Sequence, residues 1–243
     1  MRSLFSLVVL ALVTGPAWAQ NAEVQELAAV LDAWEKKTAT LESFFALVKR
    51  TNVDKDLGAR DEHRGFAMFT KADKKAGLQA MLDLTKDNNQ QVIEKYIITG
   101  NNLYEYAQVN KALRVHPMPK DQPGGGQRDA LLTFLFGMDV QQAKGRFKMY
   151  PDQHDENYHL ILIEPLRAAD KSDFTLARIA LTKKTLILAE FWYRQPNRTE
   201  VTWRVTDPQL NVNIPSKHFT PGVPDGWRLE KTPAAAPRPA TLP

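Results

Sequence analysis

The sequence of 243 residues contains no cysteine. This absence excludes disulfide bonds, thiol catalysis and a lipid-attachment cysteine after an export signal. Blocks of one charge are also absent, since 32 Lys and Arg against 28 Asp and Glu leave a net charge of only +4, with no basic run. The composition therefore does not favour nucleic-acid binding. No segment repeats, which excludes solenoids and propellers.

Both ends of the chain differ from the middle. Residues 1–19 predict an export signal, because the basic start MRS precedes the apolar run LFSLVVLALVTG and then AWA, a small-x-small cleavage pattern. The alternative, a membrane anchor, is disfavoured because the run is short for a spanning helix. Residues 232–243, TPAAAPRPATLP, predict a disordered tail or a polyproline-like spacer. We therefore expect one domain over residues 20–231, soluble in the periplasm and monomeric.

The middle of the chain predicts one helix followed by many strands. Apolar residues keep a three- and four-residue spacing from Ala22 onward, at Val24, Leu27, Leu31, Trp34 and Leu41. The pattern then changes to alternation between turn signals, which predict a tight turn at 100–102 and a hairpin turn at 195–198. The predicted strands are 45–51, 63–70, 78–86, 91–99, 103–108, 111–115, 158–163, 174–181, 185–194, 199–206 and 210–214. Their short connections predict an antiparallel meander in an α+β fold.

The stretch DALLTFLFGM, residues 129–138, is apolar on every side of a helix. Such a helix must be buried all round or must face an apolar partner, and this one is too short to cross a bilayer. It follows the glycine-rich linker 119–128 and precedes a second predicted helical piece, 139–145. A large sheet that curls without closing leaves a concave trough, and we predict that residues 129–138 cover it. The alternative is that they complete an ordinary core.

Alternating apolar residues predict the lining of this trough, because residues two apart on a strand share a face. Methionine suits such a wall, since it adapts to ligands of varied shape. For each position, ordinary core packing is the alternative. The predicted ligand-binding residues are Phe66, Met68, Leu82, Leu84, Ile161 and Ile163 on strands, with Leu131, Phe134, Leu135 and Met138 on the covering helix.

One stretch gathers residues that could bind a metal. Residues 150–159, YPDQHDENYH, hold two histidines and three carboxylates: His154, His159, Asp152, Asp155 and Glu156. Neither the spacing nor the ligand set matches a zinc or calcium pattern, and a solvated turn is the more common role of such a stretch. We therefore predict no metal and no cofactor.

Two further patterns suggest enzymes only superficially. The glycines at 124–126 lack the Lys-Ser/Thr that follows a phosphate-binding loop. Glu190 and Glu200 form a carboxylate pair such as a glycosidase uses, but on a hairpin they are expected to pair with Arg194 or Arg204. We predict a protein without enzymatic activity.

Several stretches resemble a family of exported proteins of uncharacterised function, described mainly from planctomycetes and grouped with the outer-membrane lipoprotein carriers (LolA-like). The matching stretches are LDAWEKKTATLESFFALVKRT (31–51), EKYIITGNNLYEYAQVNKALRVHPMP (94–119), LLTFLFGMDVQQAKGRF (131–147), ADKSDFTLARIAL (169–181) and FWYRQPNRTEVTWRV (191–205). The block TGNNLYEY (99–106) is similar to a hairpin of the carriers. One departure is TKADK (70–74), where carriers usually have Arg-Pro.

The resemblance implies an open half β-barrel of about ten to eleven antiparallel strands with an N-terminal helix and a short helical lid. Its concave face would take up acyl chains or a similar apolar ligand. The expected function is a periplasmic binding or carrier protein. Its expected partners are a lipid or a lipidated protein, with an envelope membrane protein as a further candidate. The alternative is an envelope sensor or interaction module that binds an apolar segment of a partner.

Overall fold

The computed structural model describes residues 17–71, 78–86, 89–118 and 143–231. In this part of the chain, α1 (Ala17–Ala39) leads into one sheet of 12 strands. The strands are β1 (Ser43–Asp54), β2 (Arg60–Thr70), β3 (Gln79–Lys86), β4 (Asn89–Thr99), β5 (Asn102–Ala107), β6 (Ala112–Pro117), β7 (Phe147–Pro151), β8 (Tyr158–Pro165), β9 (Leu176–Thr182), β10 (Leu188–Arg194), β11 (Thr199–Leu210) and β12 (Arg228–Lys231). Short helical turns are η1 (Gln108–Asn110), α4 (Ala168–Lys171) and η2 (Ser216–Phe219).

Several predicted features lie outside the described residues. The predicted export signal, 1–19, enters the described part only at Ala17, where α1 begins. The predicted covering helix, 129–138, the glycines at 124–126 and the tail, 232–243, lie wholly outside it. These remain predictions.

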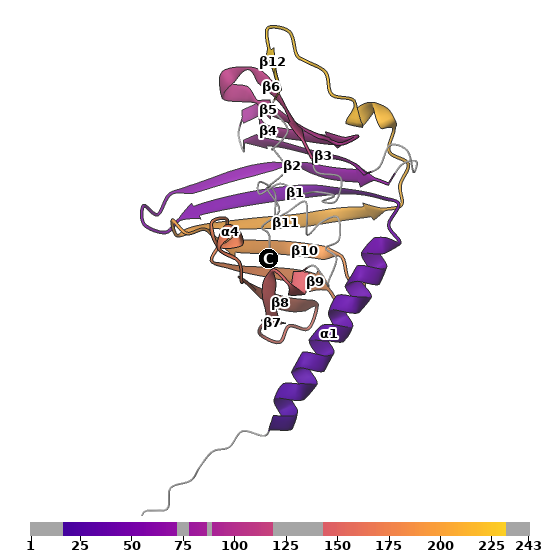
Figure 1. Ribbon diagram of the computed structural model, residues 1–243, viewed down its shortest axis with the longest axis vertical. Coiled ribbons are helices and arrows are strands. Elements are labelled where there is room, and N and C mark those ends of the chain that lie inside the picture. Colours follow the sequence, from indigo (N-terminus) through magenta and orange to yellow (C-terminus); the bar gives the residue numbers. More distant parts are fainter. Residues whose placement is uncertain (1–16, 72–77, 87–88, 119–142, 232–243) are drawn as a thin grey trace, which may run out of the picture.

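The sheet is open. Its strand order is β12-β6-β5-β4-β3-β2-β1-β11-β10-β9-β8-β7 (Figure 1). Neighbouring strands are antiparallel, except that β12 runs parallel to β6. The two end strands, β12 and β7, do not pair with each other. The predicted open antiparallel half-barrel with an N-terminal helix is therefore confirmed, with one added parallel strand.

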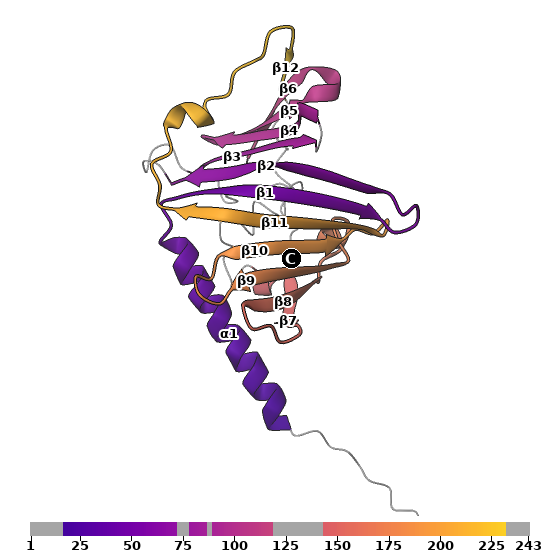
Figure 2. The ribbon, with the colours of Figure 1, turned by 180° about the vertical axis from the view of Figure 1, so that it is seen from behind.

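Both faces of the sheet carry apolar side chains. We call the side on which Val48, Leu84 and Ile161 lie the inner face, and the opposite side the outer face. The larger hydrophobic cluster occupies the inner face, and Leu31, Trp34 and their neighbours on α1 pack against it. α1 itself runs past the ends of β10, β9 and β8 (Figures 1 and 2).

The C-terminal segment covers part of the outer face. After β11 it passes through η2 and adds β12 beside β6 (Figure 1). Phe219 of η2 is buried in a second hydrophobic cluster, and Trp227 packs against it. The Tyr106 hydroxyl donates to the Gly222 carbonyl and accepts from the Gly222 N–H, both at 3.1 Å. This segment explains why the β3–β6 half of the sheet is apolar on its outer face as well.

The observed strands differ from the predicted ones in three places. Sequence alternation missed β7 and β12, which are short and carry charged residues or proline. The predicted strands 199–206 and 210–214 are wrong as separate elements, because β11 is continuous from Thr199 to Leu210. Asp207 takes a positive φ of 51°, and the pairing with β1 shifts there, so a bulge absorbs Pro208 without ending the strand. The predicted tight turn after β4 is confirmed, with Gly100 at φ 59°.

Candidate functional site

The inner face is a continuous apolar surface that extends from β4 to β7. Alternation along each strand turns every second side chain toward it. Its buried members include Leu82, Leu84, Ile161 and Ile163, all no more than 1 % exposed. Each such side chain contributes about 1.5–3 kcal/mol when it leaves water. The face is therefore a large part of what holds the sheet together.

The structure separates the predicted trough residues into two groups. Leu82, Leu84, Ile161 and Ile163 lie together on the inner face. Phe66 and Met68 lie on the outer face, in the cluster that the C-terminal segment covers. Because β2 alternates, its inner-face residues are Gly65, Ala67 and Phe69 instead. Four of the six predicted strand residues therefore share one face and two lie on the other, and the choice of ligand-binding residues remains a prediction. Leu131, Phe134, Leu135 and Met138 lie outside the described residues.

A group of polar and charged side chains lies at one end of the inner face. We call this group the polar end. Its residues are Arg50, Asp61, His63 and Glu94. Arg50 and His63 are direct cross-strand partners on β1 and β2. The Arg50 Nη1 donates to Glu94 Oε2 at 2.7 Å, and the guanidinium carbon lies 5.3 Å from the centre of the Trp203 ring. The His63 Nε2 lies 3.1 Å from Asp61 Oδ2. Charge is thus placed where the rest of the face is apolar.

The polar end holds two buried nitrogens without hydrogen-bond partners among the described residues, Arg50 Nε and His63 Nδ1. His63 is only 3 % exposed, so water reaches this ring poorly. Burial is the first cause that lowers the pKa of His63 below its ordinary value, and the neighbouring Arg50 lowers it further. Asp61 and Glu94 act in the opposite direction. The imidazole is therefore kept neutral in the folded protein.

The polar end was not predicted from the sequence. The signal was present in β1, where Phe44, Ala46 and Val48 alternate toward the inner face and the next inward position is Arg50. An arginine that continues an apolar alternation is a candidate for a buried polar role. Its partner His63 could not be predicted in the same way, because the sequence of neither strand alone determines the register in which β1 pairs with β2.

The state of His63 predicts how stability depends on pH. The unfolded chain binds a proton near pH 6.5, whereas the folded protein binds it only at lower pH. The unfolded state therefore holds more protons in this window, and the free energy of unfolding falls as the pH falls through it. We expect denaturant unfolding to show this loss between about pH 7.5 and 5.5, and His63→Leu to reduce it. If the free energy of unfolding of His63→Leu falls with pH as much as that of the original protein, His63 is not the group responsible. His218→Leu, at an exposed position, is the control and should leave the pH dependence unchanged.

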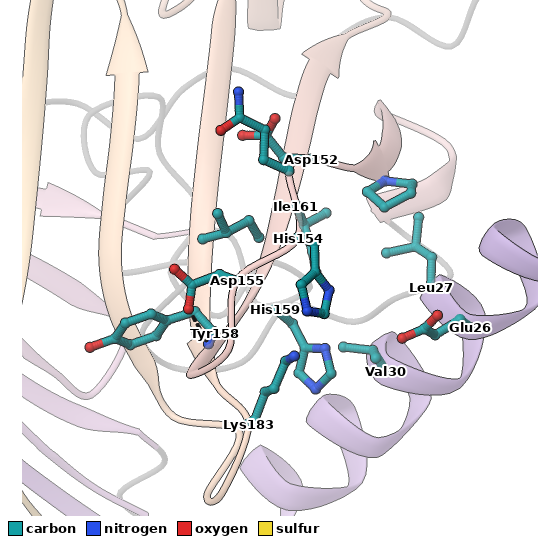
Figure 3. Close-up of a pocket in the computed structure, with 13 residues that line it drawn as sticks. Glu26, Leu27, Val30, Asp152, His154, Asp155, Tyr158, His159, Ile161 and Lys183 are labelled. Carbon is teal, nitrogen blue, oxygen red and sulfur yellow. Dashed lines mark hydrogen bonds between the residues drawn. The ribbon is translucent and has the colours of Figure 1, made fainter.

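A second hollow of about 250 Å³ lies between α1 and the β7–β8 turn (Figure 3). Glu26, Leu27 and Val30 of α1 face the turn residues across it (Figure 3). The turn and the strands beside it contribute Asp152, His154, Asp155, Tyr158, His159 and Lys183. The hollow is thus mixed in character, with apolar helix residues on one side and a polar rim on the other.

The histidines and most of the carboxylates of residues 150–159, considered above as metal ligands, lie around this hollow. Their arrangement has a structural explanation. Asp155 Oδ1 accepts hydrogen bonds from the backbone N–H groups of Asn157 and Tyr158, which is the geometry of an Asx turn. Burial lowers the pKa of His159, followed by the charge of Lys183. Within the described residues, no group of three or more His, Asp or Glu is arranged to hold a metal ion. We assign no binding role to this hollow.

The carboxylate pair on the hairpin is used in ion pairs. Glu190 lies 3.1 Å from Arg204 and 3.2 Å from Arg178. Glu200 lies 3.2 Å from Arg194 and 3.0 Å from Lys55. The predicted cross-strand pairing of these glutamates is confirmed.

Comparisons with known proteins identify the fold. No family model matches the sequence, and no curated protein matches it. An uncharacterized conserved protein from Thermus thermophilus has a similar structure, with 9 % identity over 86 % of this chain and 100 % of that chain and a TM-score of 0.53. The two proteins share a fold. At this identity, the similarity extends no further.

Other solved structures are similar at lower scores. They include a DUF1329 family protein from Desulfovibrio piger, with 10 % identity over 82 % of this chain and 97 % of that chain and a TM-score of 0.48. A LolA superfamily protein from Nitrosomonas europaea has 10 % identity over 80 % and 97 % of the two chains and a TM-score of 0.39. LolA superfamily proteins are thus among the structural neighbours. Nothing in the comparisons bears on planctomycetes.

None of the helices in the part of the chain that the structure describes is both long enough and apolar enough to cross a membrane.

Proposed function

We propose that the protein is exported to the periplasm and there binds an apolar ligand, a lipid or the acyl chain of a lipidated protein, on the inner face of its sheet. It binds this ligand without covalent chemistry. The observation that carries the proposal is the continuous apolar inner face of a sheet that does not close. A closed barrel would enclose such a face by pairing its own end strands, whereas in this sheet β12 and β7 do not pair.

The size of the inner face supports useful affinity. An acyl chain that loses several hundred Å² of apolar surface gains about 25 cal/mol for each Å². After the costs of association and chain ordering, micromolar binding remains a reasonable expectation. No polar group has to react in this mode of binding, and Glu190 and Glu200 are held in ion pairs with arginines.

Native mass spectrometry of protein purified from its own periplasm without detergent, followed by organic extraction, tests the proposal. We expect a discrete lipid adduct and a lower melting temperature after delipidation, because a ligand that binds only the folded state stabilises it. Ala67→Met, which adds volume on the inner face, should reduce the bound fraction. Leu47→Met is the matched control, because Leu47 lies on the outer face and is 44 % exposed.

The other outcomes have definite meanings. A clean mass that does not shift when phospholipid or lipopeptide is added would overturn the proposal. If such a protein still forms a stable complex in pull-downs, it is a sensor or interaction module that binds an apolar segment of a partner.

A further inference from the structure

We propose that the ligand of the inner face is amphipathic and carries a neutral polar group, an amide or a hydroxyl, that hydrogen-bonds to both Arg50 and His63. This inference rests on the proposed function and adds the chemical class of the ligand to it. Two independent features of the inner face carry it: a path of small side chains on its floor, and the unpartnered nitrogens where that path ends.

The floor of the inner face is low along β2, between the larger Val48 of β1 and Leu82 and Leu84 of β3. Ala46, Ala67 and Ala80 lie on this face, and Gly65 lies between Ala67 and His63 on the same side of β2. At one end of this path the stacked rings of Phe44 and Phe69, 5.6 Å apart, rise from the floor. The other end is the polar end of the inner face. From Ala67 to His63 the path covers four residues, about 13 Å at the rise of a β-strand.

The hydrogen-bonding character of the polar end follows from the tautomer of His63. Its Nε2 faces the Asp61 carboxylate, so in the neutral ring Nε2 carries the proton and Nδ1 is an acceptor. Arg50 Nε is always a donor. Cross-strand partners such as Arg50 and His63 have Cβ atoms about 5 Å apart. A single group that accepts from Arg50 and donates to His63 therefore satisfies both nitrogens.

The charge around this position favours a neutral group over an anion. Arg50 is already paired with Glu94 at 2.7 Å, and Lys86 is paired with Asp61 at 3.2 Å. Lys86 is the cross-strand partner of His63 on β3. The positive charges of Arg50 and Lys86 therefore balance the negative charges of Glu94 and Asp61 around the polar end. An added carboxylate or phosphate would compete with Glu94 for the guanidinium and would be repelled by both existing carboxylates. A primary amide, a secondary amide or a hydroxyl meets the donor and acceptor requirement without adding charge.

The unpartnered nitrogens of Arg50 and His63 carry an energetic cost in the folded protein. A buried polar atom without a partner destabilises a fold, and replacement by an apolar side chain of similar size is often neutral or stabilising. Leucine would remove the unpartnered Nδ1 together with the contact between Nε2 and Asp61, and Asp61 would keep its ion pair with Lys86, so a purely structural role does not require His63. The prediction that follows combines unchanged or higher stability with weaker binding.

The test measures binding of three probes to the full chain, purified without detergent, by native mass spectrometry. Decanamide offers a donor and an acceptor, N,N-dimethyldecanamide only an acceptor, and decane neither. We expect decanamide to bind about tenfold more tightly than the dimethyl amide, the effect of one hydrogen bond. His63→Leu should remove this preference without lowering the melting temperature. Arg50→Lys, which keeps a cation for Glu94 but lacks the Nε–H, should weaken decanamide binding by a similar factor.

Controls separate this inference from the proposed function. His159→Leu makes the same substitution on β8, at a position that also lies on the inner face but five strands away from β2 in the sheet, and should leave the preference unchanged. If none of the probes binds, the proposed function fails together with the inference. If all three bind alike, or the preference survives in His63→Leu, the apolar site stands and the polar contact is overturned, with Arg50 and His63 bonded to water only. Decanoate is added as a charged comparison for the three probes. If it binds more tightly than decanamide, the inference that the polar group of the ligand is neutral is overturned.

Discussion

Trp34→Ala is expected to lower the free energy of unfolding by about 3–5 kcal/mol, the range measured for large aromatic residues cut back in a core. Trp34 is 1 % exposed and is the largest side chain that α1 places against the inner-face cluster. Its removal leaves a cavity that a helix joined to the sheet at one end fills poorly. Chemical denaturation with far-UV circular dichroism measures the loss directly.

The control for this substitution lies on the same helix. Val24 is 60 % exposed, so Val24→Ala should change the free energy of unfolding by no more than about 0.5 kcal/mol. If Trp34→Ala costs less than about 1 kcal/mol, then α1 is not a structural part of the domain, and the inner-face cluster is stable without it.

Gly65→Ala is expected to cost about 3 kcal/mol or more, although it adds a single methyl group. A Cβ at this position would overlap the backbone carbonyl oxygen of Asp83 on the neighbouring strand β3. Backbone cannot move aside as a flexible side chain does, so β2 and β3 would have to separate at this point. These strands lie near the middle of the sheet, and the damage should therefore affect the whole unfolding transition. Thermal and denaturant unfolding measure it.

A second glycine provides the comparison. Gly222 has no atom within 4 Å of the position a Cβ would take, so Gly222→Ala should be close to neutral. Similar stability of the two variants would show that β2 and β3 have room to adjust at Gly65. In that case, the close approach of the strands would not constrain the residue there.

Local patterns in the sequence predicted local structure well. The turn at Gly100 and the hairpin between Arg194 and Glu200 depend on residues that are neighbours in the chain, and both were predicted. Alternation also grouped Leu82 with Leu84 correctly on one face. These predictions succeed because strand periodicity and turn chemistry are properties of short segments.

The unpredicted features depend on contacts between distant segments. Phe66 and Met68 alternate as regularly as inner-face residues do, but they belong to the outer-face cluster that includes Phe219 from the C-terminal segment, far along the chain. The strand β12 carries the sequence RLEK, which shows no strand pattern and pairs because β6 offers a free edge. Arg50 and His63 become neighbours through the register of β1 with β2. No single segment encodes these relations.

The place of β1 in the sheet has a consequence for how the chain folds. The first strand pairs along its full length with β11, one of the last, and Phe44 meets Leu210. Closing so long a loop carries a large entropic cost before any contact compensates it, and such topologies fold slowly. A chain still emerging from a ribosome or a translocation pore cannot join the two halves of this sheet until β11 has appeared. The step that unites the two halves of the sheet therefore waits for nearly the whole chain.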